Sequence, residues 1–211
     1  MKSKKYDAEF LAQIGVIIIL MILLVYTLGP SKNFGGIGVV SASSIVPIGT
    51  PEIYGEELGI KYDHVSPDNQ KLANQAINLL GNIDRVEKLE GEELERYIDI
   101  LYNMHGGISC EYCCGARSVI FSNGDPACGC AHSYAMRGLT KYLILNHPEI
   151  SDEEIMTEIG KWKVLFFPGI IEGKAQVMET LGIETDYISL TTNKYRGIEK
   201  GQTQGEMIGS C

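Results

Sequence analysis

Most of the metal-binding side chains of this 211-residue chain gather in one stretch, residues 105–132. That stretch holds five of the six cysteines and two of the four histidines: Cys110, Cys113, Cys114, Cys128, Cys130, His105 and His132. Two thiol clusters separated by a turn signal are typical of a folded metal site or a disulfide framework. We therefore expect the chemistry of this protein to depend on whether these sulfur atoms bind a metal or form disulfides.

The spacing within each cluster indicates which cysteines could act together. Cys110 and Cys113 are separated by two residues, which lets both thiolates of one tight turn face a common point. Cys128 and Cys130 are too close in sequence to share a helical face, so they fit a loop that leads into a helix N-terminus. We predict these four cysteines as metal ligands, with three substitutes: Cys114, His105 and His132.

Three interpretations of the sulfur atoms remain open. Metal coordination is favoured, because paired clusters across a hairpin resemble the spacing of a zinc ribbon. Zinc suits four thiolates or three thiolates and a histidine, Cu(I) suits thiolates with Met or His nearby, and an iron–sulfur cluster is less favoured. Structural disulfides are the second interpretation, although five clustered cysteines cannot all pair unless Cys211 supplies a sixth. Thiol-disulfide exchange is the third.

The segment around the second cluster also resembles a known group of proteins. Pro126-Ala-Cys128-Gly-Cys130-Ala, followed by a helical pattern, is similar to the membrane-anchored proteins that carry a Pro-Cys-Tyr-Cys-Gly-Cys motif. This chain lacks the first cysteine and the tyrosine of that motif, so the resemblance covers Cys128 and Cys130 alone. It implies a metal-handling role for these two residues.

Local signals predict how the clusters are brought together. Ser118–Phe121 has the pattern of a strand, and Asn123-Gly124 is a strong signal for a hairpin turn. This β-hairpin would carry Cys128 and Cys130 back to the first cluster. A helix is then expected from about Cys130 to Asn146, with Met136 on its core face rather than at the metal.

The rest of the chain beyond the linker is mostly helical in pattern. Periodic apolar residues with capping signals predict helices over 66–81, 92–104, 151–167 and 170–181, and a possible strand over 186–192. The expected fold class is mostly α: one N-terminal transmembrane helix and a small helical domain that carries a cysteine-bearing β-hairpin.

The N-terminal region has the pattern of a membrane anchor. Phe10–Leu28 is almost wholly apolar and would span about 28 Å as a helix, close to the hydrocarbon thickness of a bilayer. Three lysines precede it, at positions 2, 4 and 5, so the positive-inside rule places the N-terminus in the cytoplasm and the remaining chain outside. A cleaved signal peptide is the competing interpretation, but the apolar run is longer than usual for one.

These observations predict a single-pass protein of the cell membrane. Its parts would be a cytoplasmic N-terminus (1–9), a transmembrane helix (10–28), a flexible linker (29–50), a helical cysteine-cluster domain (51–182) and a loose C-terminal tail (183–211). An outward-facing domain would meet oxidising conditions, which strengthens the disulfide and copper interpretations.

The net charge and the motifs of the sequence restrict the classes of function that the protein could have. The net charge of −9 argues against nucleic acid as a partner, because phosphate binding needs a basic face, and it is compatible with metal cations or a basic protein partner. The sequence contains no recognisable hydrolase triad, phosphate loop, zinc-protease motif or dinucleotide fingerprint. We therefore expect a membrane-anchored, extracytoplasmic metal-binding protein without catalysis. The alternatives are an extracytoplasmic thiol-disulfide oxidoreductase and a disulfide-stapled interaction module.

Overall fold

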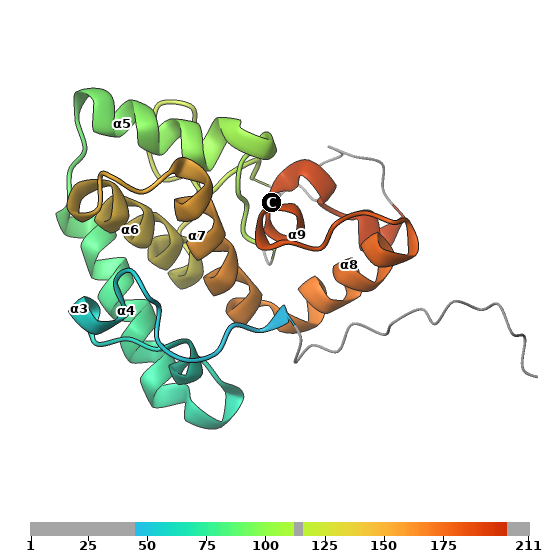
Figure 1. Ribbon diagram of the computed structural model, residues 1–211. Helices are drawn as coiled ribbons and strands as arrows, with labels where there is room; N and C mark the ends of the chain where they lie inside the picture. The colour runs from blue at the N-terminus through green and yellow to red at the C-terminus, as the bar shows by residue number, and fades with distance from the viewer. Residues whose placement is uncertain (1–44, 112–115, 202–211) are drawn as a thin grey trace, which may run out of the picture. The chain divides into compact units, whose positions relative to one another are not determined.

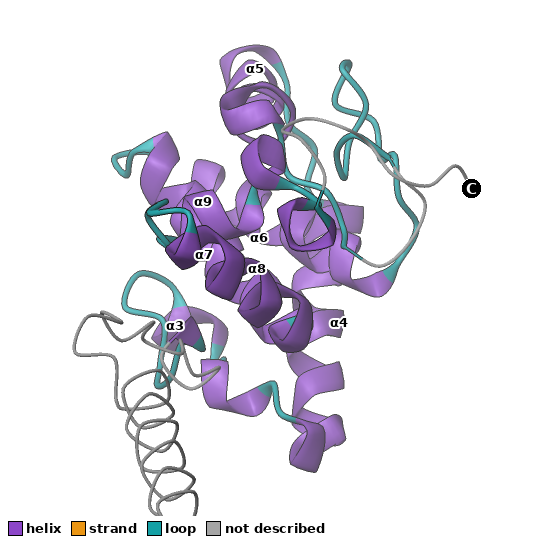
Figure 2. Ribbon diagram, turned by 90° about the vertical axis from the view of Figure 1, so that its right-hand side faces the viewer, coloured by secondary structure: helices purple, strands orange, loops and turns teal. Residues whose placement is uncertain are grey.

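The computed structural model describes residues 45–111 and 116–201, and this part of the chain is mostly helical, as the sequence predicts. Its helices are α3 (Gly55–Leu58), α4 (Gln70–Val86), α5 (Gly91–Ile98), α6 (Ala131–Asn146), α7 (Asp152–Phe166), α8 (Pro168–Thr180) and α9 (Tyr187–Thr191). Short 3-10 and π turns extend several of them. Figure 1 follows the helices along the chain, and Figure 2 shows helices and loops but no strand in the described ranges.

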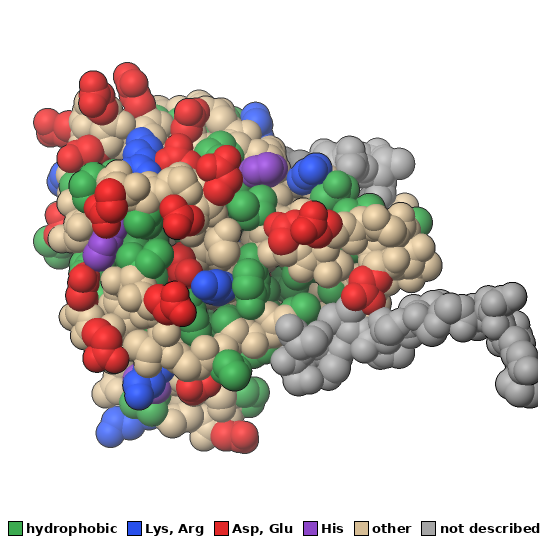
Figure 3. Space-filling view, in the orientation of Figure 1, with side chains coloured by type: hydrophobic (Ala, Val, Ile, Leu, Met, Phe, Trp, Pro, Cys, Tyr) green, Lys and Arg blue, Asp and Glu red, His purple; other side chains and the backbone are tan. Residues whose placement is uncertain are grey.

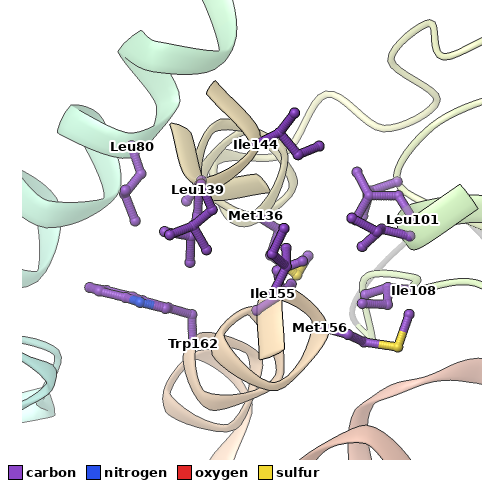
Figure 4. Close-up of a cluster of buried hydrophobic side chains, with 14 of the residues drawn as sticks. Leu80, Leu101, Ile108, Met136, Leu139, Ile144, Ile155, Met156 and Trp162 are labelled. Carbon is purple, nitrogen blue, oxygen red and sulfur yellow. The ribbon is translucent and has the colours of Figure 1, made fainter. Parts of the chain in front are cut away.

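The main core lies where α4, α6 and α7 pack together. Leu139 of α6 faces Leu80 of α4 and the indole of Trp162 on α7, Met136 of α6 lies beside Ile155 of α7, and all five side chains are buried (Figure 4). The indole Nε1 of Trp162 donates a hydrogen bond to the Tyr54 hydroxyl at 2.6 Å, so the core ring also has a polar partner. Met136 is thus a core residue, as the sequence predicts.

Helices α4 and α6 approach each other unusually closely at Gly138. A Cβ atom built on Gly138 would lie 1.8 Å from the carbonyl oxygen of Leu80, so only glycine fits there. Gly81 faces the same helix, and its own Cβ would lie 3.3 Å from that of Tyr134. The prediction that Gly81 ends its helix is wrong, because this glycine is needed for the contact and α4 continues to Val86.

Two further elements differ from the sequence prediction. The helix expected over 92–104 is regular only to Ile98, and it continues as a π turn over Asp99–Asn103. The strand expected over 186–192 is instead helix α9, which starts because the Asp186 carboxylate accepts a hydrogen bond from the Ser189 amide at 2.9 Å.

The predicted β-hairpin between the cysteine clusters is much reduced. A single antiparallel bridge joins Ile120 to Pro126, and the turn closes with a hydrogen bond from the Phe121 amide to the Asp125 carbonyl at 2.7 Å. Gly124 adopts a φ of 88°, which favours glycine. Pro126 has no amide hydrogen to continue a ladder, so the chain reverses direction without forming regular strands.

The described part of the predicted C-terminal tail, residues 183–201, packs on the domain. Leu190 and Thr191 of α9 are buried, and α9 contacts α7 and α8. In the ranges that the structure describes, no helix has both the length and the apolar character needed to cross a bilayer. The predicted span Phe10–Leu28 lies outside those ranges. Figure 3 shows acidic side chains spread over one face of the domain, in keeping with the negative net charge.

Candidate metal and thiol site

The centre of the candidate site is a close pair of sulfur atoms. The Sγ atoms of Cys110 and Cys130 lie 3.6 Å apart, although the residues are twenty positions apart in the chain. The turn between Ile120 and Pro126 brings the two segments together, as the sequence predicts. This separation is a non-bonded contact, much longer than the roughly 2.05 Å of a disulfide bond.

Cys130 is held at the N-terminus of α6. It is the N-cap residue of that helix, and its sulfur accepts a hydrogen bond from the Ser133 amide at 3.3 Å. The Ser133 hydroxyl lies 3.2 Å from the same sulfur. A serine or aspartate oxygen usually fills this position. In α6 a cysteine sulfur fills it instead, and the amide and hydroxyl of Ser133 lie within hydrogen-bond distance of that sulfur.

These donors favour the ionised form of Cys130. The hydrogen bond with the Cys110 sulfur is the largest cause that lowers the pKa of the Cys130 thiol, and His132 and Ser133 lower it further against the opposing effect of partial burial. The pKa of Cys130 therefore lies well below its ordinary value, which favours the thiolate form. A thiolate is the form that binds metals and attacks disulfides.

Cys128 lies in the same apolar cluster as the sulfur pair. Cys110 and Cys128 are buried there against side chains of α7, α8 and α9: Val164, Phe167, Ile171, Ala175, Met178 and Leu190. Cys130 is half-buried and packs against this cluster. Three of the four predicted ligands thus come together on one side of the domain. Cys113 and the substitute Cys114 lie outside the described residues.

The two histidines of the stretch occupy different environments. His132 lies in the first turn of α6, next to Cys130, and its ring packs against Phe166 and Phe167 with centroid distances of 4.7 and 5.1 Å. It supports the thiolate by a hydrogen bond. His105 is exposed in a turn and has a positive φ of 49°. Over residues 45–111 and 116–201, no three His, Cys, Asp or Glu side chains converge as a set that could hold a metal ion.

Asn193 holds both ends of the loop that contains the first cysteine cluster. Its side-chain amide nitrogen donates to the carbonyls of Gly106 and Arg117, one on each side of the loop. Its Oδ1 accepts a hydrogen bond from the Ser109 hydroxyl at 2.6 Å, and its backbone amide donates to the Gly107 carbonyl at 2.9 Å. Sequence reasoning missed this residue, because Asn193 falls in the predicted tail and matches no local motif.

Buried charges lie directly beside Cys110. The carboxylate of Glu111 forms an ion pair with the fully buried Lys163 of α7 at 2.6 Å. Burial would raise the pKa of Glu111, but the charge and hydrogen bond of Lys163 outweigh it and hold the pKa below its ordinary value. Lys174 of α8 is also buried, and it donates to the Thr192 carbonyl at 3.3 Å. The helical periodicity of α7 and α8 predicts the buried faces but gives no sign that lysines lie on them.

Comparison with known proteins identifies no relative from which a role for these residues could be inferred. The chain matches no protein-family model, no curated protein and no solved structure. The similarity to the Pro-Cys-Tyr-Cys-Gly-Cys proteins therefore stays a prediction from the residues around Cys128 and Cys130.

Proposed function

We propose that this protein binds a transition-metal ion through cysteine thiolates, with Cys110 and Cys130 as two of the ligands. The observation that carries the proposal is the 3.6 Å separation of their Sγ atoms. Two sulfur atoms of a tetrahedral zinc site, each about 2.3 Å from the metal, are about 3.8 Å apart. The pair therefore needs almost no rearrangement to become one edge of such a tetrahedron.

The remaining ligands follow from position in the fold and in the sequence. Cys128 shares the apolar cluster of the pair, and Cys113 follows Cys110 at the spacing of a zinc-binding turn. His132 suits a supporting role, because it follows Cys130 in the first turn of α6 and lowers the pKa of the Cys130 thiol. The metal would be zinc or Cu(I), and its role would be structural or in metal handling.

The proposal includes a place for the protein in the cell. The apolar segment Phe10–Leu28 and the three lysines before it support a membrane anchor with the domain on the outer side. The acidic composition suits a metal cation or a basic protein as partner rather than nucleic acid.

A second candidate function is thiol-disulfide exchange, and one observation favours it. Cys130 is half-buried and its pKa is lowered, whereas its neighbour Cys110 is buried, which suits an attacking and a resolving cysteine. In exchange with the disulfide of a partner protein, the Cys130 sulfur would form a mixed disulfide and release one partner thiolate, and Cys110 would then attack Cys130 and release the second. The two Sγ atoms would approach from 3.6 Å to about 2.05 Å in that last step.

Elemental analysis of the full-length chain, purified in detergent without oxygen, tests the proposal. We expect about one zinc or copper ion per chain in the wild type, loss of that metal in Cys110→Ser and Cys130→Ser, and retention in the control Cys211→Ser. A metal-free wild type with a disulfide between Cys110 and Cys130, mapped by mass spectrometry, would reject the metal site and favour exchange. A metal-free wild type with both thiols reduced would reject the metal site as well.

A further inference from the structure

We propose that Arg137 is the positioning residue of the thiolate site, because its buried guanidinium joins helix α4 to the backbone of Cys128 and to Val119, the segment that is hydrogen-bonded to both cysteine-bearing segments. The side chain is fully buried, two helical turns after Cys130 on α6. The expected effect of Arg137 on metal affinity rests on the proposed function. Its effect on the position of Cys128 does not, and can be measured without a metal.

The guanidinium makes directed contacts to two loops and one helix. Its Nη1 donates to the carbonyl of Cys128 at 2.8 Å and to the carbonyl of Val119 at 3.1 Å. Its Nε donates to the Asp84 carboxylate of α4 at 2.9 Å. The guanidinium carbon Cζ lies over the Tyr134 ring, 4.5 Å from its centroid. A planar fork of donors can satisfy such an arrangement, whereas the single ammonium of a lysine cannot.

The Val119 carbonyl connects this contact to the first cluster. That carbonyl also accepts a hydrogen bond from the Ala127 amide at 3.1 Å, and the Val119 amide donates to the Ile108 carbonyl at 2.9 Å. Ile108 precedes Cys110 by two residues, and Ala127 directly precedes Cys128. Arg137 therefore contacts the central segment of a three-segment backbone arrangement that carries the cysteines.

Helix α6 links the Arg137 side chain to Cys130. Cys130 is fixed as the N-cap of α6, and Arg137 follows it by seven residues, so both lie on the same face of the helix. One rigid element thus holds the thiolate at its start and the carbonyl of Cys128 through a side chain two turns later. Loss of the guanidinium would release Cys128 while Cys130 stayed in place.

Lys141 provides a matched control for the charge of Arg137. Its ammonium also pairs with Asp84, at 2.8 Å, and it donates to the carbonyls of Asp84 and Glu87. None of these partners belongs to a cysteine segment. If Arg137 served only to neutralise Asp84 and stabilise the fold, then Arg137→Lys, which keeps the charge, and Lys141→Met, which removes one, would both leave Cys128 exposure and metal affinity at the wild-type values while folded.

The test uses the full-length chain in detergent, with thermal unfolding of each variant measured first. Cobalt(II) is titrated into the apoprotein, and sulfur-to-cobalt charge-transfer absorption reports the thiolate ligands. Iodoacetamide labelling of the native apoprotein, mapped by mass spectrometry, reports the exposure of Cys128. We expect Arg137→Lys to weaken cobalt binding at least about tenfold and to label Cys128 at least about tenfold faster, at temperatures where it stays folded. Lys141→Met should match the wild type in both.

Equal behaviour of the two variants in labelling and in cobalt affinity would overturn the proposal. A wild type that binds no cobalt would reject the metal site, and the labelling of Cys128 would still decide the role of Arg137. If Arg137→Lys does not fold, Asp84→Asn removes the anchor of the guanidinium on α4. Faster labelling of Cys128 in that variant than in Lys141→Met supports the proposal, and equal labelling contradicts it.

Discussion

Lys174 makes a sharp prediction about how stability depends on pH. Burial is the main cause that lowers its pKa to about 8, from the ordinary 10.5, and the nearby positive charges of Lys163 and Arg196 add to it. The carboxylates of Glu111 and Glu199 oppose the shift without cancelling it. The folded protein therefore releases this proton at lower pH than the unfolded chain.

The sign and size of the effect follow from proton linkage. Between the folded and unfolded pKa values the unfolded chain binds more protons at Lys174, so the free energy of unfolding rises with pH there. Each pKa unit corresponds to about 1.4 kcal/mol, so a rise of about 2 kcal/mol is expected between about pH 7 and pH 9.5. Above about pH 10 the buried tyrosines, whose pKa values are raised by burial, would begin to act in the opposite direction.

Urea unfolding of the wild type and Lys174→Met, with reductant and chelator present, checks this prediction. The lowered pKa of Cys130 adds a pH dependence of the same sign, but it is common to both proteins and cancels in their difference. We expect the stability advantage of Lys174→Met over the wild type to shrink by about 2 kcal/mol over this pH range. A constant difference, like that expected for the exposed control Lys88→Met, would refute the reasoning.

Four further variants test the packing and the loops. Gly138→Ala should lower the free energy of unfolding by about 3 kcal/mol or more in urea titrations, because its Cβ would overlap a backbone oxygen of α4. Gly129→Ala, where nothing lies within 4 Å of the added Cβ, should change it by less than about 0.5 kcal/mol. Ser151→Ala removes the capping box of α7 and should lower the melting temperature, with a cost of about 1 kcal/mol. Asn193→Asp loses two amide donors, so backbone hydrogen exchange of residues 106–111 should accelerate at least about tenfold; an unchanged rate would contradict the loop-holding role.

The sequence predicts most helices of this domain because local signals agree with the packing. The capping box at Ser151 and Glu154 forms as expected, with both reciprocal hydrogen bonds, and α7 begins there. Pro126 delays the next helix, so Cys130 becomes its N-cap. Where prediction failed, a contact distant in sequence decided the outcome. Gly81 looked like a helix end, but the close approach of α6 makes it an interior residue of α4.

The approach of the two cysteine-bearing segments is predictable from the sequence, whereas the residues that hold these segments in place are not. Cysteine spacing and the turn at Asn123-Gly124 predict that the segment of Cys128 and Cys130 returns to the first cluster, but they do not indicate that Cys110 and Cys130 form the close pair. Asn193 is 83 residues beyond Cys110 and lies in a segment without periodicity or a motif, so no local pattern links it to the loop that it holds. The burial of Lys163 is equally hard to predict, because a lysine on an amphipathic helix is normally expected to be exposed.

Two buried ion pairs lie beside the cysteine-bearing segments. Their chemistry favours a role in fixing the positions of these segments over a role in stabilising the fold. Glu111 pairs with Lys163 next to Cys110, and Arg137 pairs with Asp84 behind Cys128. Removing such charges from water costs several kcal/mol per ion, and apolar residues of similar size often give an equally stable fold. Their hydrogen bonds, however, have fixed directions, which apolar contacts lack. A thiolate site must hold its sulfur atoms to within about 0.5 Å, and the ion pair at Arg137 supplies that constraint on the backbone of Cys128.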